Sequence, residues 1–263
     1  MSHQCRFCDK PLKYTFADLG VSPLANSYLN ESQLQNMEPF YPLRVYVCEG
    51  CYLVQLPVFQ SSVEIFSDYA YFSSYSDSWL QHAKNYADSM IERFGFGPEN
   101  QIIEIASNDG YLLQYFKEKK IPVLGIEPAE NVAQAAKEAQ IPTLVKFFGF
   151  QTATELAAEE KQADLLIGNN VLAHVPDVND FVKGMKVILQ PQGVITMEFP
   201  HLSRLVAENQ FDTIYHEHFS YFSFTTVKQI FGHHGLEIFD VEELPTHGGS
   251  LRIYAHHKKD RSR

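Results

Sequence analysis

Residues 102–110 read Ile-Ile-Glu-Ile-Ala-Ser-Asn-Asp-Gly, a short apolar strand that runs into an acidic loop. Downstream, short apolar runs alternate with stretches of about ten residues that have helical spacing. This alternation predicts an α/β fold with a doubly wound parallel sheet, whose ligand site lies at the carboxyl end of the first strand. The strands are expected at 102–106, 123–126, 143–148, 164–168 and 193–199, and the helices at 111–119, 130–139, 151–160 and 178–189.

The sequence on either side of this alternation completes the expected architecture. Apolar periodicity predicts further helices at 79–94 and 226–235, and further strands at 43–47, 52–56, 236–242 and 251–256. The first 60 residues are punctuated by prolines, which suits a small β lobe. The 263 residues are therefore expected to divide into a lobe with an aromatic linker at 1–75 and a larger domain at 76–263.

All four cysteines lie in two Cys-x-x-Cys pairs, Cys5 with Cys8 and Cys48 with Cys51. Each such turn points two thiolates at one tetrahedral centre, so the doubled pair predicts a zinc site. Four reduced cysteines or two disulfides are the alternatives, and disulfides are unfavourable in a reducing cytosol. Four thiolates leave no open coordination position, so the zinc is expected to stabilise a lobe too small for its own core.

The charge balance limits the classes of partner. With 21 Lys and Arg against 32 Asp and Glu, the formal net charge is −11, which disfavours nucleic acid. A basic run is found only in the tail at 256–261. No window approaches the roughly 18 apolar residues of a membrane helix, and no signal peptide is recognised. We expect a cytoplasmic protein that contacts no membrane.

The loop at 104–110 has the character of a site for a cationic ligand. It lacks the Gly-x-Gly-x-x-Gly of dinucleotide sites and the Gly-Lys-Ser/Thr of phosphate loops. Glu104 and Asp109 would repel a phosphate, and Glu127 at the tip of the second strand can accept hydrogen bonds from ribose hydroxyls. Each residue alone has an ordinary explanation as a turn or a solvated carboxylate, but their order along one predicted sheet favours a shared site.

This pattern resembles the class I S-adenosylmethionine (SAM)-dependent methyltransferases, whose acidic motif Glu-x-(Gly/Ala)-Ser-x-x-Gly the loop matches. The resemblance implies a Rossmann-like fold with SAM as cofactor. The residues that it implies at the cofactor are Glu104, Ala106, Asn108, Asp109 and Gly110 around the methionine part, Glu127 and Pro128 at the ribose, Phe147 or Phe148 at the adenine, Asn169 and Asn170 beneath the cofactor, and Tyr71 and Tyr75 above it.

Histidines cluster in the last part of the chain, where eight of the eleven lie at or beyond position 201. The densest group is Tyr-His-Glu-His-Phe-Ser-Tyr at 215–221. A metal site is one interpretation, but on a strand Glu217 would face away from the two histidines, and His-Glu-x-x-His is absent. A turn of surface histidines is the plain alternative.

A closer resemblance covers essentially the whole chain. After the doubled cysteine pair come Tyr-x-Tyr-Phe-Ser-Ser, the acidic loop, Asn-Asn-Val-Leu-Ala-His-Val-Pro-Asp-Val, the 215–221 block and His-Gly-Gly-Ser-Leu-Arg, in that order. This set is similar to the C-methyltransferases that act at C-3 of nucleotide-linked 4-keto-deoxyhexoses. Members of that family continue well beyond the last block, so the resemblance implies that their C-terminal domain is lacking here.

The chemistry of such a reaction suits the 215–221 block. A 4-ketone acidifies the hydrogen on C-3, so the enzyme needs a base there and hydrogen-bond donors for the developing enolate. Histidine titrates near neutrality, which suits a base. We predict His218 as the base, with His216 as its alternative, and Glu217, Tyr215 and His174 as its supports. His216, His247 and Arg252 are predicted substrate contacts.

Two other functions stay open at this level. The chain could methylate another small molecule or RNA, although its charge disfavours RNA. It could also be a non-catalytic interaction module that carries a zinc lobe and a degenerate cofactor fold, although the intact acidic loop and Glu127 argue against degeneration.

Overall fold

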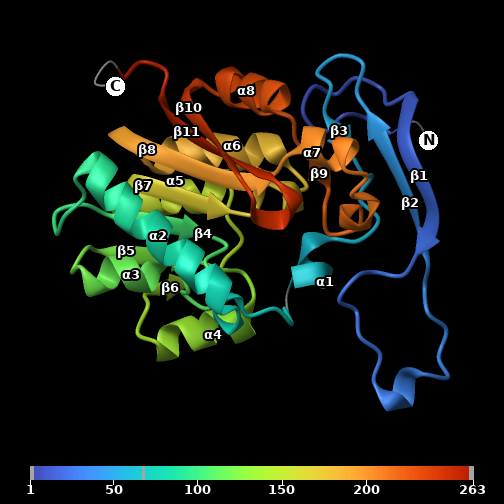
Figure 1. Cartoon of the computed structure of the whole chain (residues 1–263), viewed down its shortest axis with the longest axis horizontal. Helices are drawn as coiled ribbons and strands as arrows, with labels where there is room; N and C mark the ends of the chain where they lie inside the picture. Colours follow the sequence, from blue (N-terminus) through green and yellow to red (C-terminus); the bar gives the residue numbers. More distant parts are fainter. Residues whose placement is uncertain (1–2, 67–68, 261–263) are drawn as a thin grey trace.

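The computed structural model describes residues 3–66 and 69–260, which form two sheets with helices around the larger one (Figure 1). Ser67 and Asp68 of the aromatic linker and Arg261 of the basic tail lie outside these residues. The larger sheet has seven strands in the order β10-β11-β8-β7-β4-β5-β6. Its strands are β4 (Ile102–Ile105), β5 (Val123–Ile126), β6 (Thr143–Leu144), β7 (Ala163–Asn169), β8 (Leu189–Pro200), β10 (Leu236–Leu244) and β11 (Ser250–His257).

The strand order creates the site. The chain runs from β4 outward through β5 to β6 and then returns to β7 on the opposite side of β4. The loops that follow β4 and β7 therefore diverge and leave a crevice at the carboxyl end of β4, as expected for a doubly wound sheet. The five strands β4 to β8 are parallel, as the alternation predicts. In contrast, β11 is antiparallel to both of its neighbours, β8 and β10.

Helices cover both faces because successive apolar residues of the central strands point to opposite sides. Ile102 and Leu165 pack with α2 and α3 on one face, while Ile103 and Leu166 pack with α5, α6 and α8 on the other. The helices are α1 (Ser62–Phe66), α2 (Asp77–Phe94), α3 (Leu113–Glu118), α4 (Glu130–Glu138), α5 (Phe150–Ala158), α6 (Val178–Ile188), α7 (Leu202–Ala207) and α8 (Phe224–His233). Short 3-10 turns are η1 (Glu31–Gln33), η2 (Ser73–Tyr75), η3 (Leu172–His174), η4 (Phe211–Thr213) and η5 (Thr246–Gly248).

Several of the expected strands differ in length from the observed ones, and three differ by three residues or more. The strand predicted at 52–56 is reduced to Val54–Gln55. The strand predicted at 143–148 ends at Leu144, because the backbone N–H of Lys146 donates to the Leu144 carbonyl and the chain turns there. The strand predicted at 193–199 extends from Leu189 to Pro200. It reaches back to pair with Ala163 at the start of β7.

The second sheet is antiparallel and has the order β1-β2-β3-β9, with strands β1 (Tyr14–Ser22), β2 (Tyr41–Val47), β3 (Val54–Gln55) and β9 (Ser220–Tyr221). Three of its strands belong to the N-terminal lobe, but β9 directly follows the 215–219 turn of the larger domain. The lobe is therefore tied to the histidine-rich turn by backbone hydrogen bonds. The predicted division at residue 75 remains a prediction.

None of the helices in the described ranges combines the length and the apolar character needed to cross a bilayer.

Candidate active site and metal site

A cavity of about 700 Å³ opens at the carboxyl ends of β4, β5 and β7. One end is walled by the loops after these strands, which include Ala106, Glu127 and Asn169. The other end is walled by the histidine-rich turn and by the loop around His247. The cavity thus joins the predicted cofactor residues to most of the predicted catalytic residues. Its volume lies within the range of about 300–1,000 Å³ that is usual for small-molecule sites.

Glu127 directly follows β5 and is almost completely buried. One carboxylate oxygen accepts the backbone N–H of Asn108 at 2.9 Å, and the other accepts that of Ala129 at 2.9 Å. Burial raises the pKa of Glu127. Each oxygen keeps a further lone pair, so the carboxylate can accept a pair of hydroxyl groups such as those of a ribose.

The acidic loop fixes the aromatic linker above the cavity. The Asn108 side chain accepts the N–H of Ser73 at 2.9 Å and donates to the Tyr71 carbonyl at 3.0 Å. The Asp109 carboxylate accepts the N–H of Ser74 at 3.0 Å. Asn108 and Asp109 are therefore used mainly to hold the 71–74 segment in place, and Tyr71 consequently lines the cavity.

Ala106 stands where the methyltransferase motif most often has glycine, and its φ angle is +56°. Only glycine adopts this left-handed region without cost, so alanine here stores roughly 1 kcal/mol of strain. Asn108 and Asn170 share this conformation with φ angles of +49° and +54°. Asparagine tolerates it better than most residues, because its short side chain can hydrogen-bond locally.

The predicted cofactor residues fall into two groups. Those that line the cavity are Tyr71, Ala106, Asn108, Glu127, Pro128, Phe147, Phe148, Asn169 and Asn170. Glu104, Asp109, Gly110 and Tyr75 are not in the lining. Glu104 is fully buried, and desolvation places its pKa well above the usual value. Tyr75 is 81% exposed and stacks on Phe72.

The lining is compatible with SAM. The Oδ1 atom of Asn170, which lines the cavity, is buried without a hydrogen-bond partner among the described residues, so polar capacity remains at this end. Glu127 offers acceptors to the ribose, and Phe147 and Phe148 offer apolar surface to the adenine.

His218 lies at the opposite end of the cavity and is held at both ring nitrogens. Its Nδ1 lies 2.9 Å from the Thr213 carbonyl, which can only accept, so Nδ1 carries the proton. In the neutral ring, Nε2 is therefore unprotonated, and it accepts from the Tyr215 hydroxyl at 3.0 Å. Burial and the nearby imidazoles of His174 and His247 lower the pKa of His218 to about 3.

His174 forms the second half of this arrangement. Its ring centre lies 4.8 Å from that of His218, and its Nδ1 donates to the Glu217 carbonyl at 3.0 Å. Burial lowers the pKa of His174 to about 4. Two neutral imidazoles with unprotonated Nε2 atoms thus lie side by side. The arrangement can accept a proton, but it offers no carboxylate to either ring.

Glu217 and His216 make their contacts away from the His218–His174 pair. Glu217 accepts the Asn26 side-chain amide at 2.7 Å, and burial raises its pKa. His216 is outside the cavity lining, because its ring packs against Tyr41 and Phe59 and lies 3.2 Å from the Pro42 carbonyl. Among the described residues, the acidic and histidine side chains of this turn form no cluster with metal-site spacing.

The two C-terminal substrate predictions fall in different places. His247 lines the cavity at φ +51°, with its ring edge against Trp79. Arg252 does not line the cavity. Its guanidinium is buried and donates to Glu198 at 2.8 Å and to Glu242 at 3.3 Å.

Tyr69 also lines the cavity and was not singled out from the sequence. Its ring packs against Phe66 and Tyr71, and burial together with the Glu217 carboxyl raises its pKa. It therefore stays protonated at neutral pH and can donate a hydrogen bond. Glu217 is remote from Tyr69 in the sequence, so no local pattern could indicate that the two side chains lie near each other.

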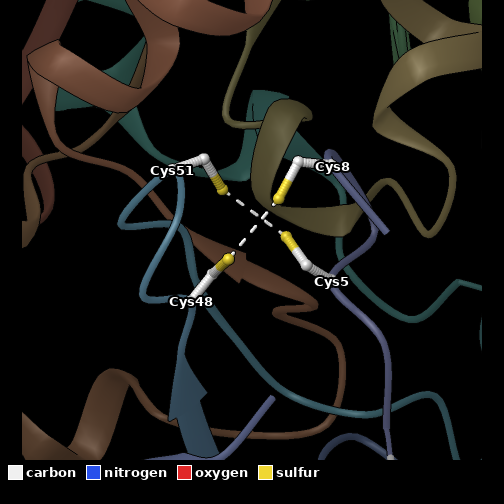
Figure 2. Close-up of side chains that lie close together, drawn as sticks. All are labelled: Cys5, Cys8, Cys48 and Cys51. Carbon is white, nitrogen blue, oxygen red and sulfur yellow. Dashed lines mark hydrogen bonds between the residues drawn. The ribbon is translucent and has the colours of Figure 1, made fainter. Parts of the chain in front are cut away.

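The four cysteines converge from two turns on one point (Figure 2). All four sulfur atoms lie within 4.8 Å of one another, and the Sγ atoms of the pairs Cys5–Cys51 and Cys8–Cys48 are 3.5 Å apart. Tetrahedral zinc with Zn–S bonds of about 2.3 Å needs sulfur atoms about 3.8 Å apart, so the set fits. Backbone N–H of Gly50 and side-chain N–H of Gln55 donate to Sγ atoms of this set.

Comparisons with known proteins agree with this geometry. The family model described as "Putative zinc binding domain" matches residues 5–66, and the model "Methyltransferase domain" matches residues 79–241. The C-methyltransferase NovU of Streptomyces niveus is 34% identical over 252 residues, which are 96% of this chain and 60% of NovU. The chain therefore spans about three fifths of the length of that relative.

Solved structures agree on the fold. The PH0226 protein from Pyrococcus horikoshii superposes with a TM-score of 0.58 at 15% identity, covering 76% of this chain and all of that protein. Magnesium protoporphyrin IX methyltransferase (ChlM) from Synechocystis, with bound SAH, has a TM-score of 0.53 at 12% identity. That match covers 67% of this chain and 82% of ChlM.

Proposed function

The chain belongs to the methyltransferase family, with a SAM-dependent class I fold and an N-terminal zinc-binding domain, and from this premise we propose that it methylates C-3 of a nucleotide-linked 4-keto-deoxy sugar. One observation carries the proposal: the neutral His218, with Tyr215 and His174, faces the cofactor loops across a single cavity. The similarity to NovU supports a carbon as the methylated atom.

The chain's own residues would generate the nucleophile. When bound, SAM supplies a methyl group on a sulfonium, which an electron-rich carbon can attack. A 4-ketone weakens the C-3–H bond, and His218 Nε2 holds the lone pair that can take this proton. The proton reaches Nε2 directly, or the Tyr215 oxygen takes it while the Tyr215 hydroxyl passes its own proton to Nε2. The Thr213 carbonyl then stabilises the resulting imidazolium through Nδ1–H.

The developing enolate oxygen needs donors that remain protonated. Burial raises the pKa values of Tyr69 and Tyr215, so both hydroxyl groups are donors at neutral pH. His174 cannot donate from Nε2 while it is neutral, because its proton is on Nδ1. Tyr69 is therefore the donor that we assign to the enolate oxygen, because the Tyr215 hydroxyl hydrogen is already directed at His218 Nε2.

The lining is suited to the sugar and not to the diphosphate. Among the described residues that line the cavity there is no lysine or arginine. A diphosphate is recognised by cationic groups, so it would lie outside this lining while the keto-sugar occupies the end near His218. The sugar ring is thus the part of the substrate on which this chain's selectivity would depend.

The experiment separates proton removal from methyl transfer. The protein is incubated in deuterium oxide with a nucleotide-linked 4-keto-deoxy sugar and without SAM, and deuterium at C-3 is followed by NMR. We expect exchange in the wild type, loss of at least about 100-fold in His218→Ala, and no change in His3→Ala, which alters an exposed histidine. SAM affinity should be the same in all three proteins.

Product analysis with methyl-labelled SAM then identifies the acceptor atom. A labelled methyl group on C-3 supports the proposal. A methyl group on a sugar oxygen, or exchange that survives in His218→Ala, contradicts it.

A further inference from the structure

Arg6 lies between two zinc-site cysteines in the sequence, yet its side chain leaves the metal site. The guanidinium donates to the Pro176 carbonyl at 2.9 Å and to the Leu56 carbonyl, and it lies 5.6 Å from the centre of the Phe219 ring. Pro176 follows the turn that carries His174, Leu56 follows β3, and Phe219 directly follows His218. Arg6 therefore contacts three segments that come together only in the folded chain.

These contacts close a ring of hydrogen bonds. Arg6 joins Pro176 to Leu56, the Leu56 N–H donates to the Phe219 carbonyl at 3.0 Å, and the Phe219 N–H donates to the Ala173 carbonyl at 2.8 Å. The short run from Ala173 to Pro176 completes the ring through the chain. Every link except Arg6 is backbone, so the guanidinium is the one side chain that sets the ring's size.

His174 lies within the run from Ala173 to Pro176 that completes this ring, and His218 directly precedes its member Phe219. The 4.8 Å separation of their ring centres therefore depends on the backbone positions of Ala173 and Phe219 as well as on the hydrogen bonds that orient each ring. A guanidinium is planar and can donate to two carbonyls in fixed directions, which a lysine ammonium cannot reproduce. Loss of the Arg6 links would remove one constraint on the two segments, which would then be held by the Phe219–Ala173 and His174–Glu217 hydrogen bonds.

The cysteine site in turn holds the backbone of Arg6. The Gln55 side chain accepts the Arg6 N–H at 2.9 Å and donates to Cys5 Sγ at 3.2 Å. On the other side, the Asn179 side chain at the start of α6 donates to the carbonyls of Arg6 and Phe7. The cysteine turn is thus clamped against the helix that follows the His174 loop.

We propose that Arg6 is a positioning residue, which transmits the geometry of the four-cysteine site to the His174–His218 pair. The consequence for catalysis rests on the proposed function. The consequence for the two imidazoles does not, and this difference allows the two ideas to be tested separately.

The test compares Arg6→Lys and Arg6→Ala with Lys13→Gln, which removes an exposed cation of the same lobe. All variants are first measured for zinc content and SAM affinity, which we expect to remain within about twofold of wild type. The ring nitrogens of His174 and His218 are then followed by NMR in histidine-labelled protein. We expect shifted Nε2 and Nδ1 signals in both Arg6 variants and unchanged signals in Lys13→Gln.

The catalytic arm uses deuterium exchange at C-3. In Arg6→Lys we expect the maximal exchange rate to fall about 10- to 100-fold, with little change in the half-saturating sugar concentration, because misplaced groups affect the reaction more than binding. Arg6 also lines a small surface pocket of about 180 Å³. Added guanidinium ion should therefore restore part of the rate in Arg6→Ala and none in Arg6→Lys.

The outcomes are distinct. Unchanged histidine signals in Arg6→Lys and Arg6→Ala overturn the proposal, as does a loss of zinc that accounts for every other change. Shifted signals together with no exchange in the wild-type protein would uphold the positioning role and reject the proposed reaction.

Discussion

The Nε2 atom of His218 lies 3.0 Å from the Tyr215 hydroxyl oxygen, while Nδ1 of the same ring faces the Thr213 carbonyl. The imidazole is thereby fixed in one tautomer, and its free lone pair is directed at a phenol. A base held in this way acts through, or next to, that hydroxyl. The pair is therefore the first place to test by mutation.

Tyr215→Phe removes the hydroxyl and keeps the ring. We expect the rate of C-3 exchange to fall about 10²- to 10⁴-fold, the usual range for loss of a general acid or base, and SAM affinity to be unchanged. Tyr14→Phe changes an exposed tyrosine of β1 and is the matched control. Exchange at the wild-type rate in Tyr215→Phe would exclude the hydroxyl from proton transfer.

The buried histidines predict a dependence of stability on pH. Histidine in an unfolded chain titrates near pH 6.5, and His218 in the folded protein near 3. Between these values the unfolded state binds more protons, so the free energy of unfolding should fall as the pH drops below about 6.5. Urea titrations at pH 7 and pH 5 should show a smaller difference in His218→Gln than in wild type. An equal difference would contradict the lowered pKa.

Glu127 should decide the affinity for SAM. Glu127→Ala removes the acceptors for two backbone N–H groups as well as those available to ribose hydroxyls. Hydrogen bonds to charged groups contribute about 1.5–3 kcal/mol, so we expect the dissociation constant to rise about 10- to 100-fold in calorimetry. Glu130→Ala, at an exposed site just after the same loop, is the control. Unchanged affinity in Glu127→Ala would remove Glu127 from the cofactor site.

Removal of zinc should destabilise the N-terminal lobe. Either a strong chelator or Cys48→Ser should abolish the stoichiometric metal and lower the melting temperature, because closed four-thiolate sites contribute directly to folding. Metal analysis and differential scanning calorimetry make the comparison. A metal-free protein that melts at the wild-type temperature would show that the cysteines have no structural role.

Arg252 should matter for stability. Its guanidinium and the Glu198 carboxylate form a buried ion pair at 2.8 Å. Arg252→Met leaves the buried carboxylate without its guanidinium partner and with only His82 and Thr246 beside it, which costs about 3 kcal/mol. Glu198→Gln/Arg252→Met should cost less than the sum of the single changes. Arg204→Met breaks an exposed pair with Glu243 and should cost under about 1 kcal/mol. Additive single changes at Arg252 and Glu198 would contradict coupling of the pair.

The sequence predicts features that depend on local spacing. The cysteine site and the α/β alternation are confirmed, because a knuckle turn and an apolar period are properties of a few neighbouring residues. The end of β6 was misjudged, since the turn at Lys146 has no strong signal such as glycine or proline.

Long-range contacts were beyond the sequence. Asn26 meets Glu217 across 191 positions, and Arg6 meets Pro176 across 170. Arg252 and Glu198 both lie in strands that the sequence predicts. The sequence spacing does not show that these two strands are neighbours in the sheet, so it does not predict the ion pair. Whether His216 or His218 faces the cavity likewise depends on the backbone of the 215–219 turn, which has no regular period.

The pairing of β3 with β9 bears on the order of events during synthesis. All four cysteines precede Ser220 and Tyr221, and 169 positions separate Cys51 from Ser220. The nascent chain can therefore capture its metal long before the edge of the small sheet is filled and before Pro176 is available to Arg6. We expect zinc binding to precede formation of the cavity, so that the nascent chain already holds zinc before His174 and His218 come together.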